Sequence, residues 1–138
     1  MDVNVTFEIA SPHHWADNLL LTAQEAQDLR YARGNGGWLE HRPQGLGVWV
    51  VSERHPNGRV HFFTVTAEKL VKAAAYVLQG AEDINLGDGG SRSVHEDIAA
   101  AFIFDDARQL DPWTADAVLQ RAVFGKVLWS SDPPPLTP

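Results

Sequence analysis

Residues 46–66 read LGVWVVSERHPNGRVHFFTVT, and this stretch decides the fold. It contains two runs rich in β-branched and aromatic residues, 46–52 and 59–66, separated by His55-Pro56-Asn57-Gly58. Asn-Gly between two such runs is the strongest short signal for a β-hairpin, because both residues tolerate a positive φ. Each run is apolar on both of its faces, so we expect these strands to lie centrally in a sheet that is covered, at least in part, on both sides.

The segment before the hairpin predicts two further strands and one helix. Residues 3–9 alternate strictly between apolar and polar side chains, which is typical of a half-buried strand. Thr22-Ala23-Gln24-Glu25 has the form of a capping box and predicts a helix of about 12 residues. The glycine-rich run 34–37 would end that helix, and 38–41 is a short possible strand.

The segment after the hairpin predicts three helices. Residues 66–80 carry an apolar stripe at helical spacing, and Ser93-Val94-His95-Glu96 is a second capping box. The helix that follows this box should run to about 104 and be deeply buried, because 102–104 are all apolar. Asp111-Pro112 predicts the start of the last helix and Gly125 its end.

The order of predicted elements is therefore β-α-β-β-β-α-α-α, which indicates an α+β fold. We expect a small, mostly antiparallel sheet of three to four strands packed with about four helices. A chain of 138 residues has the usual length of one domain, so we predict a single domain over 1–130 and a Pro-rich tail over 131–138.

The composition excludes several classes of protein. The chain has no cysteine, which excludes disulfides, thiol catalysis and cysteine-ligated zinc. A net charge of −7 argues against a protein that coats nucleic acid through bulk charge. The sequence has no apolar run of about 18 residues and no signal-peptide pattern at its start, so we expect a cytoplasmic protein with no membrane association.

The charge is distributed unevenly along the chain. Residues 1–37 hold two basic and five acidic side chains, for −3, and residues 73–138 hold four basic and ten acidic, for −6. The hairpin region 38–72 holds five basic and three acidic side chains, for +2. One interpretation is a solvated surface that keeps a small protein in solution, and the other is an acidic face that meets a basic protein surface.

No motif for catalysis or cofactor binding is present. His13-His14 is expected in a loop, where adjacent side chains diverge, and His95-Glu96-Asp97 would point in different directions on a helix. The acidic residues Asp105, Asp106 and Asp111 fall at a helix end and turn, where Asp is favoured for local hydrogen bonds. The glycine-rich loop at 87–92 fits neither a P-loop nor a calcium loop. The sequence thus predicts no catalytic residue, no metal ligand and no cofactor, although a metal-dependent hydrolase stays open as a third hypothesis if His and Asp side chains converge.

A second hypothesis is DNA binding through the sheet. Three short strands followed by a helix, over 38–79, resemble in layout the three-stranded DNA-reading domains of the integrase-arm type. Those domains use Arg and Trp on the exposed face of the sheet. The residues that could serve in this way are Arg42, Trp49, Arg54, Arg59 and His61. Five cations with three acids nearby are sparse for neutralising phosphates, so nucleic acid is the less favoured partner.

The C-terminal segment 104–129 is similar to a pattern in small uncharacterised accessory proteins of actinobacterial phages. In that pattern an acidic turn leads to Ala-Asp, a Gln-containing helix and Phe-Gly with an aromatic end. The matching residues here are Asp111, Ala115, Asp116, Gln120, Phe124, Gly125, Val127 and Trp129. The resemblance implies a phage or prophage origin in a high-GC host, and it implies no activity.

These observations favour a non-catalytic phage accessory protein that binds a protein of host or phage origin, with a homodimer also possible. Exposed tryptophans beside the hairpin would be natural anchors at such an interface. The candidate interface residues are Trp49, Arg54, Arg59, His61 and Trp113.

Overall fold

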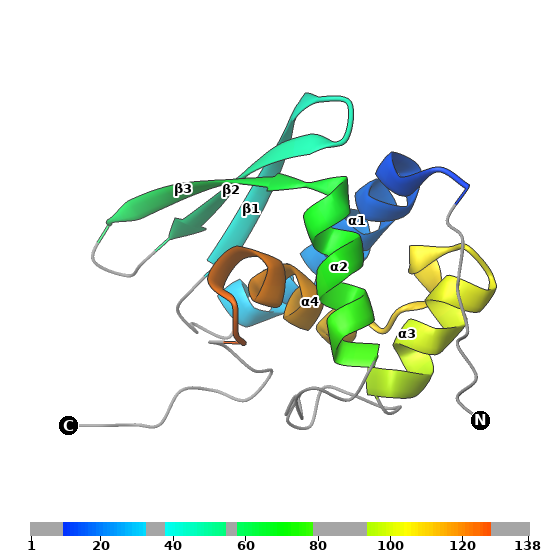
Figure 1. Ribbon diagram of the computed structural model, residues 1–138. Helices are drawn as coiled ribbons and strands as arrows, with labels where there is room; N and C mark the ends of the chain where they lie inside the picture. Colours follow the sequence, from blue (N-terminus) through cyan, green and yellow to red (C-terminus); the bar gives the residue numbers. More distant parts are fainter. Residues whose placement is uncertain (1–9, 33–37, 55–57, 79–93, 128–138) are drawn as a thin grey trace.

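The computed structural model describes residues 10–32, 38–54, 58–78 and 94–127 (Figure 1). These residues form helices and an antiparallel sheet, which confirms the predicted α+β class. The elements, in chain order, are α1 (Pro12–Ala32), β1 (Trp38–Gly45), β2 (Val48–Arg54), β3 (Val60–Thr66), α2 (Ala67–Leu78), α3 (Val94–Ile103), the 3-10 helix η2 (Ala107–Gln109) and α4 (Pro112–Phe124).

The sheet contains the predicted hairpin and has the strand order β1-β2-β3. The pairing places Val51 opposite Phe63, and Gly58 has a φ of 85°, which suits the end of a tight hairpin connection. Strand β1 extends beyond the predicted 38–41, and its pairing with β2 shifts register between Pro43 and Gly45.

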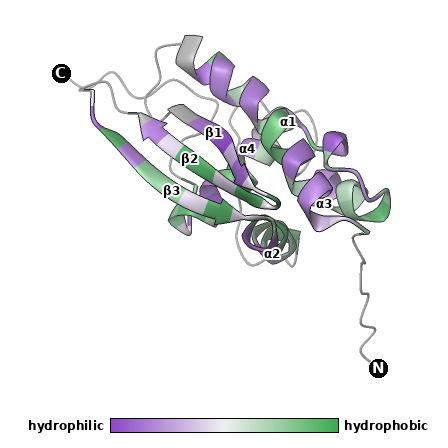
Figure 2. Ribbon diagram, turned by 90° about the horizontal axis from the view of Figure 1, so that it is seen from above, coloured by the Kyte–Doolittle hydropathy of each residue, from purple (hydrophilic) through white to green (hydrophobic). Residues whose placement is uncertain are grey.

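Within residues 10–32, 38–54, 58–78 and 94–127, helices cover only one face of the sheet, so the expected cover on both sides is wrong for this part of the chain. The inner-face residues Trp49, Val51 and Val65 are at most 3% exposed, whereas Phe62 on the other face is 70% exposed. Figure 2 shows the helices gathered on one side of the strands. Helices α1, α2 and α4 contact the strands from this side, whereas α3 packs mainly against α2 and η2. The described part has no second helical layer for the outer face.

Helix α1 begins ten residues before the predicted capping box at Thr22. Pro12 is its first residue, where the missing N–H costs nothing, and the Trp15 N–H donates to the Ser11 carbonyl at 3.0 Å. Thr22 lies inside the helix, and its hydroxyl donates to the Asn18 carbonyl at 2.8 Å. The Thr22 hydroxyl thus bonds back to the preceding turn and caps nothing.

The last helix has the ends that the sequence predicts. The Asp111 carboxylate accepts from the Trp113 N–H at 2.9 Å, Pro112 occupies the first turn, and Gly125 ends the helix with a φ of 75°. Every residue of α4 from Trp113 to Gln120 is buried, so this helix is surrounded by the other elements and has no solvent-facing side in its first two turns.

The hydrophobic core lies between the sheet and the helices. Its large apolar side chains include Trp15, Leu19, Leu20, Trp49, Val51, Val65, Leu70, Val77, Ile98, Phe102, Leu110, Trp113, Val118 and Leu119. Ile103 and Phe104 are 63% and 66% exposed, so the deep burial expected for the end of α3 is wrong. Leu46 lies in the turn between β1 and β2 and is 82% exposed, because β2 begins two residues later than predicted.

Several predictions concern residues outside the described ranges. They are the strand at 3–9, the glycine stop at 34–37, the end of the predicted helical stripe at 79–80, the capping residue Ser93, the loop at 87–92 and the tail at 131–138.

Candidate functional site

The two predicted tryptophan anchors lie in the core. Trp49 is 3% exposed and Trp113 is 6% exposed, so neither side chain is available to anchor a partner. Trp49 faces the helices from β2. The Trp113 ring lies 5.9 Å from the guanidinium carbon of Arg30, measured to the ring centroid. Both residues therefore support the fold, because aromatic rings with their large apolar area fill the layer between sheet and helices.

The residues of the predicted DNA-reading face do not share one surface. Arg42 lies on the outer face of the sheet, whereas Trp49 and His61 belong to the inner face. His61 and Arg59 are exposed, and the His61 Nδ1 is 3.7 Å from the Glu53 carboxylate. The side chain of Arg54 lies outside the described part. The expectation of one exposed face is wrong because alternate residues of a strand point to opposite sides.

The histidines are distributed over different elements. His13 and His14 stand in the first turn of α1 and not in a loop, with ring centroids 4.5 Å apart. His41 lies on β1, His61 on β3 and His95 on α3, and His55 is outside the described residues. Within the described ranges, no three side chains of His, Asp or Glu gather in a group that could hold a metal ion.

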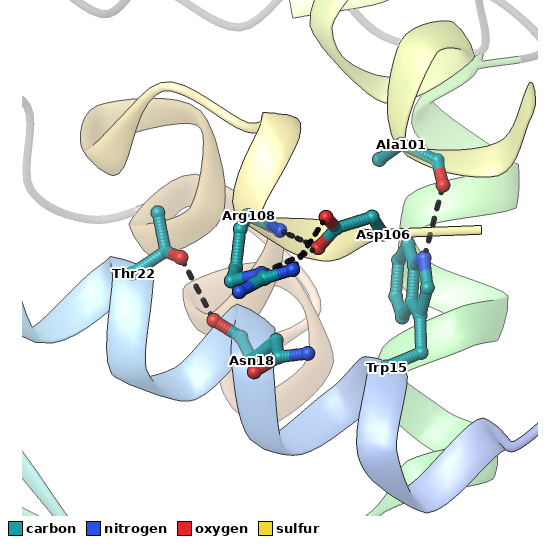
Figure 3. Close-up of polar contacts among 6 residues, drawn as sticks. All are labelled: Trp15, Asn18, Thr22, Ala101, Asp106 and Arg108. Atoms are coloured by element: carbon teal, nitrogen blue, oxygen red, sulfur yellow. Dashed lines mark hydrogen bonds and ion pairs between the residues drawn. The ribbon is translucent and has the colours of Figure 1, made fainter. Parts of the chain in front are cut away.

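The carboxylates near the last two helices accept hydrogen bonds that support the fold, two of them within a few residues and one from the segment before α1. The Asp106 carboxylate accepts from the Arg108 backbone N–H at 2.9 Å and from its Nε at 3.0 Å, capping η2 (Figure 3). These bonds hold the pKa of Asp106 below its usual value. Asp105 accepts from the Ala10 N–H at 3.1 Å, and Asp111 caps α4. This arrangement stabilises the connection between α3 and α4.

A buried polar cluster, which the sequence did not reveal, joins α1 to α4. Arg30 forms an ion pair with Asp116, and the amides of Gln27 and Gln120 donate to the same carboxylate at 3.3 and 2.7 Å. Burial raises the pKa of Asp116, while the guanidinium and the two amides act in the opposite direction. The sequence hints at this cluster only through polar residues at helical spacing among apolar ones. They stand at 27 and 30 in α1 and at 116 and 120 in α4.

This cluster fixes the rotation of α1 about its axis. Because Gln27 and Arg30 point into the protein, the residues on the opposite side of the helix point to solvent. That side carries three exposed acids, Asp17, Glu25 and Asp28, and it carries Leu21 and Leu29 at 57% and 47% exposure. We call these five residues the acidic face of α1. No lysine or arginine with a described side chain belongs to it.

The outer face of the sheet carries a second surface of different character. A pocket of about 240 Å³ opens there, lined by Glu40, Arg42, Val50, Ser52, Val60 and Phe62. Phe62 and Val60 are 70% and 41% exposed, so the apolar part of this pocket is contributed mainly by β3. With one acid and one base beside each other on β1, the pocket has no strong charge of either sign.

The comparisons with known proteins give no assignment for these surfaces. No helix in the described ranges is both long and apolar enough to cross a membrane. No protein-family model matches the chain. No curated protein and no solved structure match it either.

Proposed function

We propose that the protein has no catalytic role and acts by binding a basic surface of another protein through the acidic face of α1. The observation that carries this proposal is the mixture on that face of three carboxylates with two half-exposed leucines. A face that served only to keep the protein in solution would not need leucines among its acids. Interfaces between separately folded proteins commonly have an apolar centre and a polar rim, and the two leucines bordered by carboxylates match that arrangement.

The charge on this face indicates the chemistry of the partner. Lysine and arginine side chains opposite Asp17, Glu25 and Asp28 would accelerate association and reject acidic surfaces, including nucleic acid. The leucines would supply the contact area that water-exposed ion pairs alone do not provide. Following the C-terminal resemblance, the partner would be a protein of a phage or of its actinobacterial host.

DNA binding through the sheet receives less support from the same observations. Phosphate binding needs several cations on one surface. The pocket on the outer face of the sheet combines Arg42 with Glu40 and with exposed Val60 and Phe62. That combination is poorly suited to a duplex and better suited to apolar side chains.

The proposal can be tested by affinity capture from an actinobacterial lysate with the whole chain as bait. The test variant neutralises the acidic face with Asp17→Asn, Glu25→Gln and Asp28→Asn. Its matched control removes the same amount of charge elsewhere, with Glu68→Gln, Glu96→Gln and Asp105→Asn. A specific partner should be retained by the control and bind the test variant about tenfold more weakly, with an association rate that falls as salt is added.

A further variant separates electrostatic attraction from contact. Leu21→Ser leaves all three carboxylates in place, so a partner held by the proposed face should also be lost from this variant. A partner that binds the neutralised variant and Leu21→Ser as well as it binds the parent protein would contradict the proposal, as would the absence of any enriched protein.

A further inference from the structure

The two edges of the sheet differ in their chemistry. β1 is the edge strand on one side, and it contains Pro43, a register shift between Pro43 and Gly45, and the charged residues Glu40 and Arg42. Proline, bulges and charges are the features by which natural proteins prevent an edge strand from pairing with another chain. The β1 edge is therefore protected.

β3 is the other edge strand, and it has none of these features. Its sequence, VHFFTVT, contains no Pro, Gly, Lys, Arg, Asp or Glu and consists mainly of β-branched and aromatic residues. Val60, His61, Phe62 and Thr64 are exposed, and no described strand pairs with its outer side. An exposed edge of this length and composition offers a row of backbone donors and acceptors to another strand.

We propose that β3 pairs edge to edge, in antiparallel orientation, with β3 of a second copy of this chain. The two three-stranded sheets would join into one of six strands about a two-fold axis. If the pairing is centred on Phe63, Phe62 lies opposite Thr64 of the partner subunit, and Val60 lies opposite Thr66 of the partner subunit. Both pairs place an apolar side chain beside a β-branched one, which is a favourable cross-strand combination.

Two properties of the chain favour a second copy as the occupant. The strand carries no formally charged residue other than a protonatable His61, so two copies bring no like charges together across the junction. In addition, β3 lies within the segment 38–72, which has a net charge of +2. The acidic face belongs to α1, and α1 packs beside β1 at the opposite side of the sheet (Figure 2). The repulsion expected between two molecules of net charge −7 is therefore smallest at this edge.

Among the described strands each copy has one unprotected edge, and this also determines the size of the assembly. When the same edge of both copies is used, the interface is self-complementary, and pairing leaves only the two protected β1 edges at the ends of the joined sheet. The assembly then stops at a dimer and does not extend into a fibre. The outer faces of both copies lie on the same side of the joined sheet, so their two pockets become parts of one surface.

The test is the molecular mass of the full chain in solution, measured by sedimentation equilibrium over a wide range of protein concentration. The parent chain should reach twice its 15.2 kDa. The double variant Phe62→Lys/Thr64→Lys should remain at the mass of one chain, because each new lysine would lie opposite a lysine of the partner subunit. Both positions are exposed on the outer face, so the substitutions remove no core contact.

The matched control, Phe62→Lys/Thr64→Glu, changes the same two positions but would place a lysine opposite a glutamate across the two-fold axis. It should retain the dimer, and circular dichroism would verify that both variants fold. A parent chain that stays at 15.2 kDa at every concentration overturns the proposal, as does a dimer that survives Phe62→Lys/Thr64→Lys. The measurement needs no other protein, so its outcome is independent of the partner proposed for α1.

Discussion

Arg30 on α1 and Asp116 on α4 form a fully buried ion pair between residues that are 86 positions apart in the sequence. The guanidinium also lies over the Trp113 ring, and Gln27 and Gln120 bind the carboxylate from the same two helices. A buried pair of this kind specifies how two helices pack, because a rotation or a shift of either one would leave a charge in the core without its counter-charge.

Replacing Asp116 by Asn should destabilise the protein by about 3–5 kcal/mol, because it leaves the buried Arg30 without a counter-charge. Urea unfolding followed by tryptophan fluorescence would measure the loss. The control is Asp106→Asn, which breaks a solvent-exposed pair with Arg108 and should cost far less. The double replacement Arg30→Met/Asp116→Leu should be more stable than Asp116→Asn, since it removes both charges together. If Asp116→Asn were no worse than its control, the pair would have no part in stability.

Stability should decrease as the pH is lowered through about 6.5, in part because of His41. Burial lowers the pKa of His41 below its ordinary value of about 6.5, and the carboxylates of Asp17 and Glu40 only partly oppose this effect. Between the lowered pKa and 6.5 the unfolded chain binds more protons than the folded chain, so the free energy of unfolding rises with pH in this window.

The replacement His41→Gln should flatten this dependence. The free energy of unfolding of both proteins, measured in urea between about pH 5 and pH 8, isolates the contribution of His41 as a difference. One group can contribute a slope of at most about 1.4 kcal/mol per pH unit, and above pH 7 the difference between the two proteins should be constant. Identical slopes below pH 6.5 would show that folding does not disfavour the protonated form of His41.

The replacement Gly125→Ala should destabilise the protein by about 1 kcal/mol. The glycine ends α4 with a φ of 75°, and a Cβ added there would meet no atom within 4 Å. The cost therefore comes from the left-handed backbone alone. Gly45→Ala is the control, because Gly45 also has open space around it but no positive φ. Thermal unfolding of both variants would measure the difference, and equal effects would contradict this explanation.

The replacement Trp15→Phe should cost about 1–3 kcal/mol. The buried indole donates to the Ala101 carbonyl at 3.2 Å (Figure 3), and its ring stacks on Phe102 at 5.2 Å between centroids. Phenylalanine would keep part of the stacking and lose both the hydrogen bond and part of the apolar contact. The control Phe104→Leu changes an exposed ring and should leave the urea midpoint nearly unchanged. A similar midpoint for both variants would argue against a structural role for the indole bond.

The sequence alone specified those parts of the fold that depend on neighbouring residues. The Asn57-Gly58 turn signal between two β-rich runs predicted the β2–β3 hairpin, and Asp111-Pro112 and Gly125 predicted both ends of α4. Turns and helix caps are formed by side chains and backbone groups within a few residues of one another, so their patterns are readable from the chain.

Only the tertiary structure decided which surfaces face solvent. Both faces of β2 and β3 are apolar in sequence, so alternation could not tell that Trp49 is buried and Phe62 exposed. In the same way, the spacing of Asp116 and Gln120 in the sequence does not by itself distinguish a buried ion-pair partner from a surface acid. Its role depends on Arg30, a residue brought beside it by the packing of α1 against α4, and such long-range contacts leave almost no periodic signal in a single sequence.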